Sequence, residues 1–207
     1  MPKGRLNKTG RNGSPVNTRG GFFRAEESGR KRVIVEHVEP QINGGQFPIK
    51  RVVGEKVIVK AHIFSDGHDR IQAELLHRTE ADKARKSTQM SYTVNDEWEG
   101  AFEIPELKSY YYTVRAWLDR FGTWQEDLRK KVAAGQKVKV DLMTGSQILD
   151  EASSRAEGVD ARELEQLARK FRQARITDKV VEAALSEELT YLADKYPDKS
   201  RDRKSVV

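Results

Sequence analysis

The feature that most constrains the fold is a run of alternating residues that begins at Tyr110 and ends near Asp119. Successive residues of a β-strand point to opposite faces of a sheet, so the run predicts a strand with two distinct rows. One row is apolar and consists of Tyr110, Tyr112, Val114, Ala116 and Leu118. The other row consists of Tyr111, Thr113, Arg115, Trp117 and Asp119. Aromatic rings on the row that should face water are expected to be covered by a ligand, by another domain or by a second copy of the chain.

Other segments show the same two-residue period. We expect strands near residues 33–35, 57–64, 71–76, 97–104 and 137–142. Loops rich in Gly, Asp, Asn and Pro separate several of them. The charged stretch 122–135 is too polar for a simple hairpin, and we interpret it as including extended strand. Six or seven short strands predict an immunoglobulin-like β-sandwich over residues 32–143.

The hydrophobic period becomes helical after this region. A lead-in helix near Ile148 and two longer amphipathic segments predict an α-helical hairpin insert over residues 144–197. Asp160 and Glu163 have the spacing of a capping box, Thr177 can cap the last helix, and Pro197 ends it. The apolar stripes exceed what two helices need for each other, so we expect the hairpin to pack on another surface. The predicted fold class is all-β with a helical appendage.

We expect both ends of the chain to be poorly ordered. Residues 1–31 form a basic tail that we expect to be disordered, and residues 198–207 are charged. Residues 1–32 hold nine Lys and Arg against two Glu, whereas the whole chain has a net charge of only +6. The basic character therefore belongs to the tail, and a nucleic-acid partner, which would use that tail, is a weak hypothesis. We predict no nucleic-acid and no membrane partner.

The sequence contains no recognisable catalytic or cofactor motif. The four histidines lack the spacing of metal ligands, and the chain has no cysteine, which excludes disulfides and cysteine-ligated zinc. We therefore predict no catalytic residue, no metal and no cofactor within the chain. The N-terminal residues lead into no apolar secretion signal and no run reaches the length of a membrane span, so we expect a cytoplasmic location.

Aromatic residues give the best candidate site. Trp117 falls in the outward row beside Asp119, and Trp124 follows in a loop or strand edge. Flat rings near Asp and Arg suit sugar binding, because a ring stacks on the C–H face of a pyranose. The alternative is that both indoles pack against the helical hairpin or a neighbouring domain. The candidate interface or glucan contacts are Tyr111, Arg115, Trp117, Asp119 and Trp124.

Several motifs resemble a known family in their order and spacing. They are RVIVEHVEP at 32–40, GQFPIKRVVGE at 45–55, VIVKAHIFSDGHD at 57–69, WEGAF at 98–102, YTVRAWLDRFGTWQED at 112–127 and GSQIL at 145–149. Over about residues 32–196 the chain resembles the start of α-1,4-glucan:maltose-1-phosphate maltosyltransferases.

The resemblance implies a place in the α-amylase superfamily, glycoside hydrolase family 13. Such enzymes transfer maltosyl from maltose 1-phosphate to α-1,4-glucans with retention. It further implies an N-terminal immunoglobulin-like module that builds a homodimer near the partner's active site. A catalytic (β/α)₈ barrel follows in the family and carries the Asp nucleophile and the Glu acid/base.

The chain departs from the family pattern in two respects. It stops at Val207 before any barrel, so we expect this chain alone to be inactive. The strand that returns to the sandwich after the helices also has no evident counterpart, which would leave one sheet edge unpaired. The leading hypothesis is a non-catalytic N-terminal module for dimerisation and acceptor-site shaping. The alternative is a free-standing carbohydrate-binding module.

Overall fold

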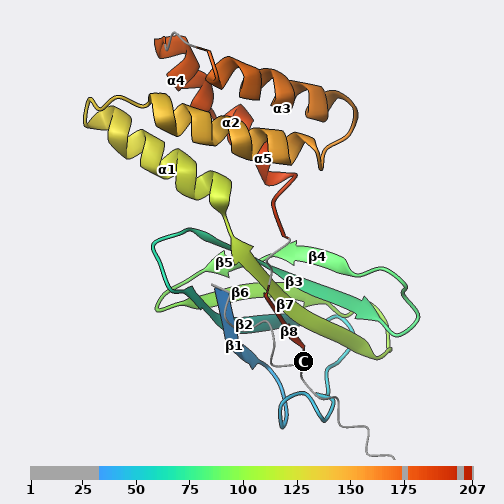
Figure 1. Ribbon diagram of the computed structural model, residues 1–207. Helices are drawn as coiled ribbons and strands as arrows, with labels where there is room; N and C mark the ends of the chain where they lie inside the picture. The colour runs from blue at the N-terminus through green and yellow to red at the C-terminus, as the bar shows by residue number, and fades with distance from the viewer. Residues whose placement is uncertain (1–32, 174–176, 200–202, 207) are drawn as a thin grey trace, which may run out of the picture. The chain divides into compact units, whose positions relative to one another are not determined.

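The computed structural model describes residues 33–173, 177–199 and 203–206 (Figure 1). The predicted tail over residues 1–31 lies outside them. The described strands are β1 (Val33–Glu39), β2 (Lys56–Ser65), β3 (Ile71–Thr79), β4 (Lys86–Gln89), β5 (Ser91–Tyr92), β6 (Glu97–Glu103), β7 (Tyr110–Leu118) and β8 (Arg203–Val206). The described helices are α1 (Arg120–Ala133), α2 (Lys139–Ser153), α3 (Gly158–Phe171), α4 (Asp178–Ala184) and α5 (Glu187–Asp194).

The strands form two antiparallel sheets, with the orders β1-β2-β6-β5 and β4-β3-β7-β8. Alternating residues of both sheets meet in one hydrophobic cluster. Val59 and Trp98 come from the first sheet, and Leu75 and Val114 come from the second. The prediction of a mainly β domain followed by helices is therefore confirmed, and the apolar row of β7 faces this shared core.

Two segments that we expected to be extended are helices. Residues 120–133 form α1, and the expected strand at 137–142 runs into α2. In α1 the buried residues Phe121, Trp124 and Leu128 recur at helical spacing, and the Asp119 side chain caps the first turn. The alternation of Val138, Val140 and Leu142 suggested a strand, but Val140 is exposed on α2. A few alternating residues fit both periods, and the burial of Gly145, Ser146 and Leu149 decides for the helix.

The helices share a second hydrophobic cluster, to which all five contribute. It includes Leu128, Leu149, Leu164, Val180 and Leu189. The expected hairpin with a lead-in helix is therefore a larger set of helices that begins at Arg120.

The helix starts agree with the predicted caps in part. Thr177 stands at the expected N-cap position, but its side chain makes no capping hydrogen bond and the helix it begins, α4, ends at Ala184. Ser186 caps a separate α5 by accepting a hydrogen bond from the Leu189 N–H. The predicted capping box at Asp160 is wrong, because α3 begins after Glu157. Asp160 instead accepts a hydrogen bond of 2.9 Å from the Tyr196 hydroxyl.

The C-terminal segment returns to the sheet. β8 pairs antiparallel with β7, from Ala116 opposite Arg203 to Thr113 opposite Val206. The expectation of a loose end and a missing returning strand is thus wrong for residues 203–206. Pairing satisfies backbone groups along the β7 edge, which would otherwise be open to another strand.

Candidate functional site

The predicted outward row of β7 lies on a sheet face that is covered at one end and open at the other. Thr113 and Trp117 are buried, Arg115 is half-buried and Tyr111 is exposed. Val114 and Ala116, on the opposite face, lie in the shared core between the sheets. The five candidate residues therefore do not form one continuous surface.

Trp117 is covered by the chain itself. Its exposed fraction is only 3%, and the Lys199 ammonium lies 4.3 Å from its ring centroid. A small cavity of about 30 Å³ beside it is also lined by Ala152 of α2 and Ala193 of α5. The indole thus packs where the helices join the sheet.

Trp124 belongs to the helical cluster. It lies on α1 with an exposed fraction of 7%, its ring is 6.0 Å from that of Phe171, and its Nε1 donates to the Asp141 carbonyl at 2.7 Å. Gly145 allows this contact, because a Cβ at that position would overlap the indole. The side chain is held by a hydrogen bond and ring contacts within the chain.

Arg115 belongs to a cluster of charges on the outer face of the β3–β7 pair. It binds Glu74, which lies directly opposite in the strand register and is 4% exposed. Glu74 also accepts hydrogen bonds from the Ser87 hydroxyl at 2.7 Å and from Lys199 at 2.9 Å. Burial by itself would raise the pKa of Glu74, but the bonds from Lys199, Ser87 and Arg115 lower it overall. The Glu74 carboxylate is therefore kept charged, and its oxygens are held by these three hydrogen-bond donors.

Asp119 has a structural position at the start of α1. Its Oδ1 accepts a hydrogen bond of 2.8 Å from the Gly122 N–H, and its Oδ2 lies 3.3 Å from Nε2 of Gln72. The same amide nitrogen donates to Asp194 of α5 at 3.2 Å. Partial burial raises the pKa of the Asp194 carboxyl, and the charge of Asp119 adds to that shift. Gln72 thus joins the sheet to the last helix.

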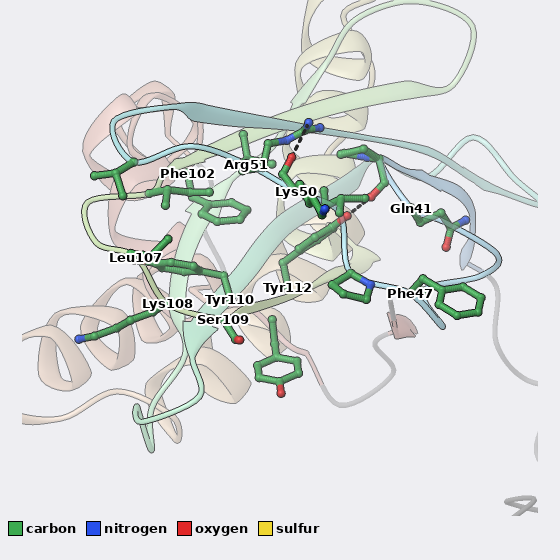
Figure 2. A pocket seen from close by; sticks show the side chains of 18 of the residues that line it. Gln41, Phe47, Lys50, Arg51, Phe102, Leu107, Lys108, Ser109, Tyr110 and Tyr112 are labelled. Carbon is green, nitrogen blue, oxygen red and sulfur yellow. Dashed lines mark hydrogen bonds between the residues drawn. The ribbon is translucent and has the colours of Figure 1, made fainter.

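Tyr111 lies at the open end of the row and lines a cavity at the loop end of the β domain. Its ring is 48% exposed, and the Arg78 guanidinium lies 5.3 Å from the ring centroid. The cavity has a volume of about 640 Å³ and lies between the β1–β2 connection and the β6–β7 connection. Figure 2 shows Tyr110 and Tyr112 between the Phe47 side and the Leu107 side of this cavity.

The two connections that form the cavity are tied together. The Gly54 N–H donates to the Ile104 carbonyl at 2.8 Å, and the Ile104 N–H donates to the Glu55 carbonyl at 3.0 Å. The Tyr112 hydroxyl donates to the Pro40 carbonyl at the base of the first connection. The walls are therefore held by backbone and side-chain bonds, as expected of a largely preformed site.

The sequence analysis missed Phe47 and Leu107, which are 58% and 89% exposed on the cavity lining. Both residues lie in loops, where hydrophobic periodicity cannot indicate which side chains are buried. For Phe47 the available signal was an aromatic residue inside a Gly- and Pro-containing connection, and for Leu107 it was an apolar residue just after Pro105.

No cluster of three or more His, Asp or Glu suited to a metal ion occurs within the described ranges. The helices described above are also all too short or too polar to cross a bilayer. The cavity lining combines aromatic, amide, hydroxyl and cationic side chains with the carboxylate of Glu106.

The family model for alpha-1,4-glucan:maltose-1-phosphate maltosyltransferase, domain N/S, matches residues 31–205. The chain belongs to this family. The match includes both sheets, the helices and most of β8, so the returning strand falls within the maltosyltransferase N/S domain.

Curated maltosyltransferases of the same description are similar over most of this chain. The protein of Chlorobaculum tepidum is 41% identical over 172 residues, which cover 83% of this chain and 26% of the relative. That of Salinibacter ruber is 38% identical, with 80% and 25% covered, and that of Myxococcus xanthus is 37% identical, with 83% and 27% covered. The chain spans about a quarter of the length of these maltosyltransferases.

Proposed function

We propose that this chain is the N-terminal, non-catalytic module of a cytoplasmic maltosyltransferase. The whole enzyme transfers maltosyl from maltose 1-phosphate to α-1,4-glucans, and the module serves in homodimerisation and in shaping the acceptor site beside a catalytic barrel. The observation that carries the proposal is the family match over residues 31–205. The two sheets with one shared core fit an immunoglobulin-like sandwich, which forms part of the proposal.

The roles of the buried carboxylates support a non-catalytic module. Retaining glycosyl transfer needs two carboxyl groups about 5–5.5 Å apart on either side of the reacting bond, one of them free to donate a proton. Glu74 is held by three hydrogen-bond donors, and Asp119 caps α1. Neither lines the large cavity between the two connections.

Two assays on the full chain test this proposal. We expect no release of phosphate from maltose 1-phosphate in the presence of glycogen, and we expect a concentration-dependent dimer in sedimentation equilibrium. Phosphate release that scales with chain concentration would contradict the non-catalytic role. A monomer at every concentration would remove the claim that this module dimerises by itself.

A free-standing carbohydrate-binding module is the second candidate. The exposed aromatic cavity at the Tyr111 end favours it. The two candidates differ in the dimer, because a free-standing module needs glucan binding but no self-association.

A further inference from the structure

The cavity between the β1–β2 and β6–β7 connections has the size and rigidity of a ligand site. Its volume of about 640 Å³ lies within the range of about 300–1,000 Å³ that is typical of small-molecule sites. Its floor is packed, since the ring of buried Phe102 lies 5.9 Å from that of Tyr112 and 6.2 Å from that of Tyr110. A ligand would therefore meet a surface that is already formed, which reduces the entropic cost of binding.

Two aromatic rings at the rim of the cavity stay accessible among the described residues. Phe47 on one connection and Tyr111 at the start of β7 are both about half exposed or more. Trp117, three positions further along the same row of β7 than Tyr111, is covered by Lys199 and the helices. Of the aromatic residues on the outward row of β7, Tyr111 is thus the one that lines the cavity and stays about half exposed, with the Arg78 guanidinium 5.3 Å from its ring centroid.

The polar groups of the lining suit hydroxyl groups better than a polyanion. Lys108 is paired with Glu106, and Arg51 lies 3.4 Å from the Glu55 carboxylate. With these two cations paired to carboxylates, Lys50 is the remaining cation of the described lining, and one positive charge attracts a polyanion only weakly. Gln41, Lys50 and Ser109 add amide, ammonium and hydroxyl groups between the apolar faces. This mixture matches a neutral sugar, which has apolar C–H faces and a rim of hydroxyls.

We propose that this cavity binds a neutral α-1,4-glucan segment, with Phe47 and Tyr111 as stacking platforms. The site would hold acceptor chain at the loop end of the β domain, away from Trp117 and Trp124. The choice of glucan as the ligand rests on the proposed function, while the position of the site rests on the cavity and its exposed rings.

Titration of the full chain with maltoheptaose by calorimetry tests the site. We expect saturable binding that weakens about tenfold or more in Phe47→Ala and in Tyr111→Ala, a change that corresponds to the loss of one favourable ring contact. The matched controls are Tyr92→Ala on β5 and Tyr191→Ala on α5, which remove exposed tyrosines elsewhere and should leave the affinity unchanged. Far-UV circular dichroism confirms that each variant is folded.

Three results would overturn the proposal: no saturable binding, unchanged binding in both rim variants, or an equal loss in the control variants. A loss of dimer in the rim variants without glucan binding would identify the rim as an interface between copies, and would also overturn it. The result of this experiment can be distinguished from the result that tests the proposed function. A chain that binds maltoheptaose as a strict monomer supports this site and contradicts the dimer, whereas a dimer that binds no glucan does the reverse.

Discussion

The two ends of strand β7 are both rich in aromatic residues, but their surroundings differ. At the Trp117 end, Lys199 and residues of α2 and α5 cover the indole. At the Tyr111 end, the β1–β2 and β6–β7 connections line an open cavity next to the strand. An aromatic residue on the outer face of a sheet is therefore expected to be buried by another group, and that group can belong to the same chain or to a ligand.

The difference arises from which segments reach each end. The helices follow directly from β7, so the chain itself supplies the material that covers Trp117. The opposite end is built from connections after β1 and before β7, and these connections are tied to each other by the backbone bonds between Gly54 and Ile104 and between Ile104 and Glu55. Rigid loops with exposed rings are a common location for binding residues.

The largest effect that would test this comparison is the loss of Trp117. We expect Trp117→Ala to lower the free energy of unfolding by about 3–5 kcal/mol, because a large buried ring is removed. Tyr111→Ala should change it by only about 0.5 kcal/mol, because the ring is half exposed. Urea unfolding followed by circular dichroism measures both values. Equal losses in the two variants would contradict the distinction between a covered end and an open end.

The next largest effect concerns the charges that hold the covered end. Glu74→Gln should lower the free energy of unfolding by about 1–3 kcal/mol, because Arg115 and Lys199 would each lose a charged partner in a largely buried setting. The matched control is Glu165→Gln on α3, which removes a solvent-exposed pair with Arg169 and should cost less than about 0.5 kcal/mol. Urea unfolding at neutral pH measures the difference.

The pH dependence gives a second measure of Glu74. Since its pKa is lowered in the folded protein, its stabilising contribution is present above the ordinary glutamate range and is lost as the pH falls through the folded pKa. Glu74→Gln should therefore flatten the acid side of the stability curve. A variant as acid-sensitive as the original chain would show that the cluster contributes nothing to folding.

Much of the β domain could be predicted from the sequence because its strands have one buried face. Alternation located β2, β6 and β7. The motif order also identified the family, which the match over residues 31–205 confirms. Local patterns are sufficient where a single periodicity extends over several residues.

The remaining features depend on contacts between distant segments. The four residues of β8 have no alternating apolar pattern, and their strand conformation comes from pairing with β7. The segment of α1 is charged along its outer face, which hid the period of Phe121, Trp124 and Leu128. Phe47 and Leu107 line the same cavity although they belong to connections far apart in the sequence, and no local sequence pattern predicts that they come together.

The smallest expected effect tests how dry the core is beside Phe102. His77 of β3 stacks on Phe102, with ring centroids 4.6 Å apart, and its buried Nδ1 has no hydrogen-bond partner among the described residues. Burial lowers the pKa of this imidazole, and the nearby Lys86 lowers it further, while Asp82 opposes the shift. The folded protein therefore favours the neutral ring.

The sign of the pH effect follows from this lowered pKa. Above the ordinary histidine range the His77 ring is neutral in both the folded and the unfolded state, so its protonation does not affect stability. As the pH falls below that range, the unfolded chain binds the proton more readily, so the free energy of unfolding decreases until the folded-state pKa is passed. Urea midpoints measured from about pH 7.5 to about pH 5 should show this decrease in the original chain and in His68→Gln, which alters an exposed turn. The decrease should be absent in His77→Phe, whose ring can keep the stacking on Phe102. If His77→Phe retains the full slope, the imidazole is solvated and its setting beside Phe102 is wetter than the packing indicates.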